Sequence, residues 1–181
     1  MGGMIAQLVA ADYPDKVLSL TSIMSSTGNP GLPRPKPEAM ARLNTPAPDP
    51  NKDLNGFLAN AVEGAKVMAS RYTPNAGQVR EQALSDFKRC YYPVGFQRQY
   101  AGIMASPDRR SKLNTIKAPT VVIHGDDDQL VPVDGGRDTA ENIPGAELRI
   151  IPGVGHEMPQ AVLGEFIDGI LAAVKRSKVG A

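Results

Sequence analysis

Two ionisable residues in the last third of the chain have the types and the spacing for acid–base chemistry. Asp128 follows the apolar run 119–124, and His156 follows the run 147–151, each across a short turn that contains glycine. Apolar runs rich in β-branched residues predict buried strands, and glycine predicts the turns that end them. Parallel strands of an open α/β sheet bring such groups together at their carboxyl ends. There, an aspartate and a histidine would be the orienting acid and the general base of a nucleophilic triad.

The nucleophile of such a triad has no good candidate in the chain. Ser25 and Ser26 also follow a predicted strand, but neither lies in the strand–turn–helix elbow that exposes a nucleophilic serine. Cys90 is the single cysteine, and we predict it to be a buried apolar side chain. His124 is expected to be a strand-end residue with local hydrogen bonds, and shaping the pocket is its alternative role. The sequence therefore contains the acid and the base of a triad without its nucleophile.

Neither a metal site nor a cofactor site is expected. The chain has two histidines, and no cysteine–histidine cluster has zinc spacing. A calcium loop that began at Asp126 would need glycine and glutamate where Val131 and Arg137 stand. Asp126 and Asp127 are therefore predicted to be turn caps or surface charges.

The composition fits one ordinary globular domain. The 181 residues are 41% hydrophobic and 22% charged, with a formal net charge of +1. This charge gives no electrostatic reason to expect nucleic acid or an anionic membrane as a partner. The chain has no apolar run of the roughly 18 residues that span a membrane, and its first residues do not have the pattern of a signal peptide. With a single cysteine, we expect a cytoplasmic location.

The predicted elements describe an α/β core with a helical insertion. Strands are predicted at 16–24, 119–124 and 147–151, with helices at 1–13, 135–142 and 160–175. The intervening segment is rich in proline up to residue 50. It contains a short helix at 38–43 and longer helices at 51–71, 76–91 and 94–105. We therefore assign 1–28 and 111–181 to the core and 29–110 to a cap or lid.

Two helices of this core have predictable packing faces. Gly2 and Gly3 give the first helix a small side, which suits close packing against a sheet. The last helix has an apolar stripe, which predicts its buried face. That face consists of Phe166, Ile167, Ile170, Leu171 and Val174.

These motifs together resemble the α/β-hydrolase superfamily. The resemblance is carried by 124–128 with Leu130–Pro132, and by 153–156 with Pro159. The stretch Tyr92–Arg109 is similar to the aclacinomycin methylesterase-like esterases of that superfamily. The resemblance runs from Met1 to about Lys175 and corresponds to the C-terminal portion of a family member. It implies a partial α/β-hydrolase fold, which holds the last three parallel strands with flanking helices and a helical lid insertion.

The resemblance also implies roles for particular residues. Asp128 would be the triad acid and His156 the general base. Residues 1–7 match the segment directly after the nucleophilic serine in the family, so this serine would stand directly before Met1. Met1 would then supply the backbone group of the oxyanion hole, here as a free amine. We expect esterase-type hydrolysis of small lipophilic esters from a protein completed by an N-terminal part, and no activity from this chain alone.

Two alternative functions and a mode of self-association remain open. The chain is alternatively a non-catalytic remnant that acts as an association or binding module. The second alternative is that the chain is part of a hydrolase with an aspartate nucleophile, like the epoxide hydrolases or dehalogenases. Those families usually place tryptophan after the nucleophile, and this chain contains none. The resemblance finally implies that strand 16–24 has an exposed edge, through which copies of the chain would self-associate.

Overall fold

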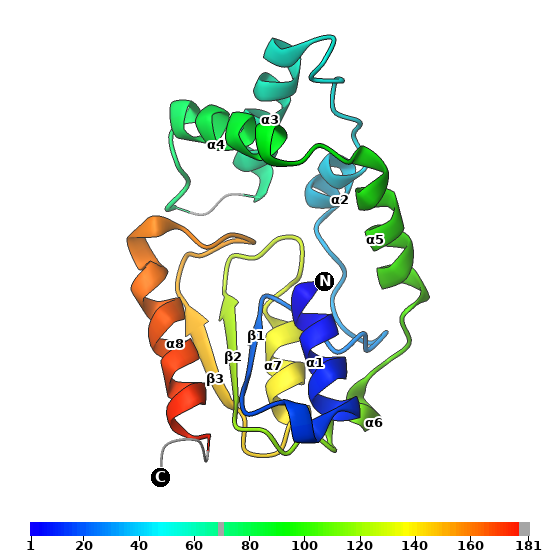
Figure 1. Ribbon diagram of the computed structural model, residues 1–181, viewed down its shortest axis with the longest axis vertical. Coiled ribbons are helices and arrows are strands. Elements are labelled where there is room, and N and C mark those ends of the chain that lie inside the picture. Colours follow the sequence, from blue (N-terminus) through cyan, green and yellow to red (C-terminus); the bar gives the residue numbers. More distant parts are fainter. Residues whose placement is uncertain (69–70, 178–181) are drawn as a thin grey trace.

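Three parallel strands form the centre of the molecule. The computed structural model describes residues 1–68 and 71–177, and Figure 1 shows the arrangement of their elements. The strands are β1 (Leu20–Ile23), β2 (Thr120–Gly125) and β3 (Glu147–Ile151), in the sheet order β1-β2-β3. All six residues of β2 are buried, because β2 has a strand on each side and helices on both faces. This confirms the partial α/β fold with three parallel strands.

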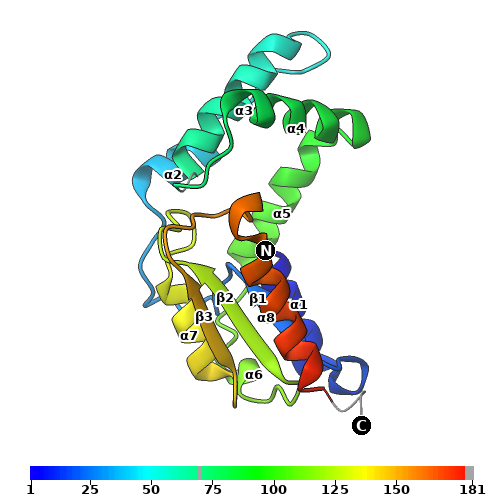
Figure 2. The same ribbon diagram turned by 90° about the vertical axis from the view of Figure 1, so that its left-hand side faces the viewer.

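Helices cover both faces of the sheet. Helix α8 (Leu163–Lys175) packs on one face, where Phe166 joins Val121 and Ile123 in an apolar core. On the other face lie α1 (Gly2–Asp12), α6 (Arg110–Leu113) and α7 (Asp134–Asn142), around Leu20, Leu113 and Ile143. The sheet is thus the middle layer of a three-layer arrangement (Figure 2).

The predicted packing faces of α1 and α8 are only partly correct. A Cβ atom on Gly3 would lie 2.6 Å from Ser25 Cβ, which confirms close packing there, but Gly2 has nothing within 4 Å. In α8 the buried residues are Phe166, Gly169 and Ala173. The prediction was wrong for the four large residues of the stripe, which are 41–49% exposed: Ile167, Ile170, Leu171 and Val174. The small residues of α8 bring its backbone close to Ile123, and the branched side chains therefore point outward.

A group of helices lies beyond the carboxyl ends of the strands (Figures 1 and 2). These helices are α2 (Pro37–Leu43), α3 (Leu54–Met68), α4 (Ala76–Arg89) and α5 (Pro93–Ala105). The described part of 29–110 contains no strand. Aromatic rings of Phe57, Phe87 and Tyr91 pack together with centroids 5.5–6.3 Å apart. Cys90 is exposed and not buried as predicted, because it ends α4 in an extended conformation outside this cluster.

The two ends of this helical segment meet beside β1. The Arg109 side chain is 2% exposed, and its Nη2 donates a hydrogen bond to the Ser26 carbonyl over 2.6 Å. The Arg109 backbone N–H donates to the Thr27 carbonyl over 2.9 Å. The chain therefore leaves the core and returns to it at one place, although the limits 29–110 remain a prediction.

Most element boundaries differ from the sequence-based expectation by a few residues. The expected strand 16–24 is observed only at Leu20–Ile23, and Pro14–Lys16 form a 3-10 turn ahead of it. The last predicted helix begins with a separate 3-10 turn at Gln160–Val162, and the four-residue helix α6 was not predicted. The expected helix 51–71 ends at Met68, and 69–70 lie outside the described residues. No helix in the described part of the chain is long and apolar enough to cross a membrane.

Candidate active site

The carboxyl ends of β2 and β3 bring Asp128 and His156 into direct contact. His156 Nδ1 lies 2.7 Å from Asp128 Oδ2. The Asp128 side chain is fully buried, whereas the His156 side chain is 29% exposed. Because a carboxylate can only accept, the proton of this hydrogen bond belongs to His156 Nδ1. The other ring nitrogen, Nε2, is left with a free lone pair when the ring is neutral.

Backbone and side-chain donors hold the Asp128 carboxylate from several directions. Its Oδ1 accepts hydrogen bonds from the N–H groups of Leu130 (2.9 Å) and Val131 (2.7 Å). Burial alone would raise the pKa of Asp128, but hydrogen bonds from His124 and His156 and the His156 charge outweigh burial and lower this pKa to about 2. Asp128 is therefore an anion at neutral pH, as the orienting acid of a triad must be.

The two loops that carry the pair are joined to each other. The Asp127 N–H donates to the Val154 carbonyl over 3.0 Å, and Asp126 Oδ1 accepts from the Gly153 N–H over 2.5 Å. Gly125 permits this approach, since a Cβ atom on it would lie 2.1 Å from the Val154 oxygen. Asp126 is thus a cap of the neighbouring loop as well as a turn residue. The sequence marks its turn but does not reveal this partner.

His124 lies directly behind the acid. It is fully buried, and its Nε2 is 2.8 Å from the Val131 carbonyl oxygen and 3.4 Å from Asp128 Oδ2. The Val131 contact confirms the expected local hydrogen bond at the strand end. Its proximity to the acid was not predicted, although the i,i+4 spacing of His124 and Asp128 across a strand-ending glycine is a usable signal.

The other sequence-based candidates are not part of this pair. The Ser25 hydroxyl is buried under α1 and has no hydrogen-bond partner among the described residues, so it is not hydrogen-bonded to His156. Met1 caps α1, and its carbonyl accepts from the Ile5 N–H over 3.2 Å. Burial, and then the charge of Arg109, lower the pKa of the Met1 amine. The role of Met1 in an oxyanion hole stays a prediction.

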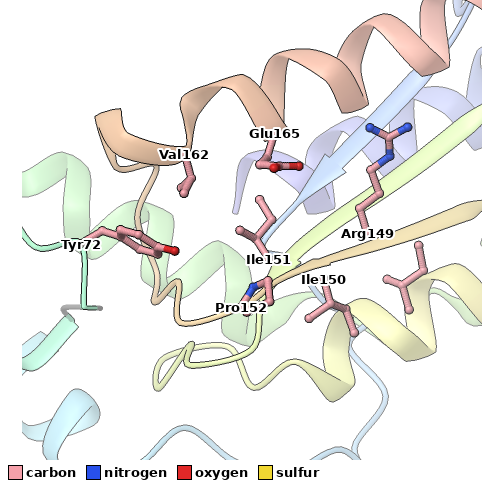
Figure 3. Close-up of a pocket in the computed structure, with 8 residues that line it drawn as sticks. Tyr72, Arg149, Ile150, Ile151, Pro152, Val162 and Glu165 are labelled. Carbon is pink, nitrogen blue, oxygen red and sulfur yellow. The ribbon is translucent and has the colours of Figure 1, made fainter.

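An open cavity lies away from the pair. It has a volume of about 500 Å³ and lies on the outer side of β3, against the start of α8 (Figure 3). Tyr72 and Val162 line one part of it, and Arg149 and Glu165 line another. Neither Asp128 nor His156 lines it, so this cavity is not the site of their chemistry. Among the described residues, no group of three or more His, Cys, Asp and Glu side chains is arranged to hold a metal ion.

Comparisons with known proteins show what the chain as a whole is similar to. The family model described as the alpha/beta hydrolase fold matches residues 1–159. The chain is 32% identical over 163 residues to the 2-hydroxy-6-oxononadienedioate/2-hydroxy-6-oxononatrienedioate hydrolase of Burkholderia vietnamiensis, covering 86% of the chain and 53% of that protein. It is 28% identical over 170 residues to the pimeloyl-[acyl-carrier protein] methyl ester esterase of Chromobacterium violaceum, covering 93% of the chain and 62% of that protein.

A solved structure shows the same fold. The 2-hydroxy-6-oxo-6-phenylhexa-2,4-dienoate hydrolase of Rhodococcus sp. strain RHA1 superposes with a TM-score of 0.72 at 21% identity, covering 97% of this chain and 61% of that one. At this identity the likeness concerns the fold alone. The chain spans 53–62% of the length of the two relatives above.

Proposed function

The chain belongs to the α/β-hydrolase family, and from that premise we propose that Asp128 and His156 are the acid and base of a serine-type hydrolase of small lipophilic esters. The observation that carries this proposal is their 2.7 Å hydrogen bond. It joins a buried anionic carboxylate to the Nδ1–H of a partly exposed imidazole and directs the second ring nitrogen away from the carboxylate. This is the arrangement of the orienting acid and general base of a triad.

Each residue has a defined task in the proposed reaction. His156 Nε2 takes the proton of a hydroxyl as its oxygen attacks the ester carbonyl, and the resulting imidazolium then protonates the leaving alcohol. Asp128 stays ionised throughout, holds the imidazole in one tautomer and stabilises its charged form. The low pKa of Asp128, about 2, supports this assignment because a protonated acid would not stabilise the imidazolium.

The nucleophile is proposed to be a serine placed directly ahead of Met1. In the family, such a serine precedes the helix that corresponds to α1, and the backbone N–H of the next residue belongs to the oxyanion hole. That next residue is Met1, which caps α1. The proposed activity therefore belongs to a protein in which this segment is joined to the chain. We expect the 181-residue chain alone to be inactive.

The proposed substrate class has two supports. The relative from Chromobacterium violaceum is named a methyl ester esterase, and α5 with the residues before it exposes apolar side chains. Tyr92, Phe96 and Met104 are 47–69% exposed. An exposed apolar surface near the carboxyl ends of the strands suits a lipophilic ester.

The test is hydrolysis of p-nitrophenyl esters by the longer protein that carries a serine ahead of Met1. His156→Ala should lower kcat/KM by about 10⁴-fold or more, since a triad without its base keeps only residual catalysis. Asp128→Asn should also lower it strongly, whereas Asp127→Asn is the matched control because the Asp127 side chain in the same turn is exposed. An active protein that tolerates His156→Ala would refute the proposed base. No hydrolysis of any ester would favour a non-catalytic association module.

A further inference from the structure

His124 is a buried ionisable residue that the proposed reaction does not use. Fully buried histidines are uncommon unless their ring nitrogens are paired. The His124 side chain has no solvent exposure, and its Nδ1 has no hydrogen-bond partner among the described residues. Contact with water therefore does not explain the position of the His124 ring, and its protein contacts must do so.

The contacts of the ring define a single tautomer. Nε2 lies 2.8 Å from the Val131 carbonyl oxygen, which can only accept, so Nε2 carries the proton. Nδ1 faces α7, where a Cβ atom on Gly136 would lie only 2.5 Å from it. A proton on Nδ1 would be a buried donor without an acceptor, which is costly. These contacts place a ring proton on Nε2 and direct it at the acid loop.

That donor closes a ring of contacts around Asp128. The Val131 N–H donates to Asp128 Oδ1, and the Val131 carbonyl accepts from His124 Nε2. The same Nε2 is 3.4 Å from Asp128 Oδ2, which is the oxygen that binds His156. His124 therefore contacts both the loop that shapes the carboxylate site and the carboxylate itself.

We propose that His124 is a positioning residue that holds the Asp128 carboxylate in the orientation that His156 needs. It acts through Asp128 and does not touch the reacting atoms. Without this donor, the 128–131 loop loses its anchor to β2, and the carboxylate turns away from the imidazole. The other ionisable groups on the two loops are Asp126, Asp127 and Glu157, and the Asp126 carboxylate is bound to the Gly153 N–H.

The inference rests on the proposed function, because positioning matters only if Asp128 and His156 act as a pair. Its test reads the pair without catalysis, by NMR of the ¹⁵N-histidine-labelled chain. The protein has two histidines, so every His124 variant leaves His156 as the single labelled ring. The quantity measured is the low-field resonance of the His156 Nδ1–H, which reports its hydrogen bond to Asp128.

His124→Phe keeps a ring of similar size and removes the donor, whereas His124→Gln places an amide N–H close to where Nε2 stands. In His124→Phe we expect the low-field resonance of the His156 Nδ1–H to broaden or disappear, because the carboxylate that it contacts is no longer held in place. His124→Gln should restore this resonance towards its wild-type position. An unchanged resonance in His124→Phe would overturn the proposal, because a merely apolar role predicts no change.

A measurement on the unmodified chain keeps the proposal testable even if these variants do not fold. The ¹⁵N shifts of His124 should report the Nε2–H tautomer that the Val131 contact requires. The Nδ1–H tautomer would refute the assigned contacts. If His156 behaves as expected but the longer protein hydrolyses no ester, the positioning role stands and the proposed function fails.

Discussion

Asp128 is buried as a charge, and its burial makes the stability of the chain depend on pH. Its pKa is about 2 in the folded chain, below the ordinary value of 3.8. A lowered pKa means that ionised Asp128 stabilises the fold fully above about pH 4 to 5, and that this contribution disappears as the pH falls towards 2. The difference corresponds to about 2 kcal/mol.

We therefore expect the free energy of unfolding of the wild type, measured in urea between pH 2 and pH 7, to rise by about this amount over that acidic range. Asp128→Asn should show a smaller rise, since the amide does not titrate. Asp127→Asn, in the same turn but exposed, is the control and should follow the wild type. Equal slopes for Asp128→Asn and the wild type would show that Asp128 does not carry this dependence.

The proximity of Asp128 and His156 follows from sequence, whereas the contacts that support the pair do not. Asp128 and His156 each come just after a strand, and parallel strands end at one edge of a sheet, so their proximity is predictable. The contact between His124 and Asp128 depends on how four loop residues fold back after β2. The periodicity of the sequence does not predict the conformation of this loop. Cys90 was misjudged because burial tendencies describe a residue type, whereas its place after α4 decides its exposure.

At the scale of elements, Gly153 in the loop before His156 is constrained both by its backbone conformation and by a neighbouring side chain. Gly153 has φ of +70°, and a Cβ atom on it would lie 2.5 Å from Arg71 Nε. Arg71 in turn donates a hydrogen bond from Nη2 to the Pro152 carbonyl over 3.0 Å and lies over the Tyr72 ring. This arginine, between α3 and α4, joins the helical segment to the loop that carries His156.

Gly153→Ala should therefore lower the free energy of unfolding by more than backbone strain alone would. Gly145 is the matched control, because it has the same φ of +70° and nothing within 4 Å. We expect Gly145→Ala to lower the free energy of unfolding by about 1 kcal/mol, and Gly153→Ala by about 1 kcal/mol more as Arg71 is displaced from its carbonyl. In an Arg71→Ala background the excess should vanish. Equal costs for the two glycines would mean that the Arg71 contact contributes nothing.

Strands were easier to predict than helix faces. The predicted strand 147–151 coincides with β3, because β-branched residues between two turns favour a strand. The exposed side of α8 was misassigned, since both its large and its small apolar residues satisfy helical periodicity. Packing chose Gly169 and Ala173, which let the helix backbone approach Ile123. Which residues of α8 are buried depends on the shape of the sheet, so the sequence of the helix alone does not predict them.

At the scale of the whole molecule, β1 is an edge strand with apolar surface beside it. In the described residues β1 pairs with β2 on one side only. Ile5 and Val9 of α1 are 51% and 41% exposed, and the large apolar residues of α8 are similarly exposed. An unpaired edge between two apolar helix surfaces favours association with another chain. We therefore expect the 181-residue chain to self-associate.

A single proline distinguishes association through this edge from general apolar aggregation. The N–H groups of Leu20 and Met24 donate to the carbonyls of Pro119 and Ile123 over 2.9 Å each, on the side of β2. The strand period therefore directs the Thr21 N–H towards the free edge. Thr21→Pro removes a donor from that edge without breaking the ladder, as proline is tolerated on edge strands. In sedimentation experiments Thr21→Pro should shift the distribution towards monomer with the helix content retained. Ser22→Pro, whose lost N–H faces β2, should instead unfold the sheet. Association that persists unchanged in a folded Thr21→Pro chain would assign it to the exposed helix faces.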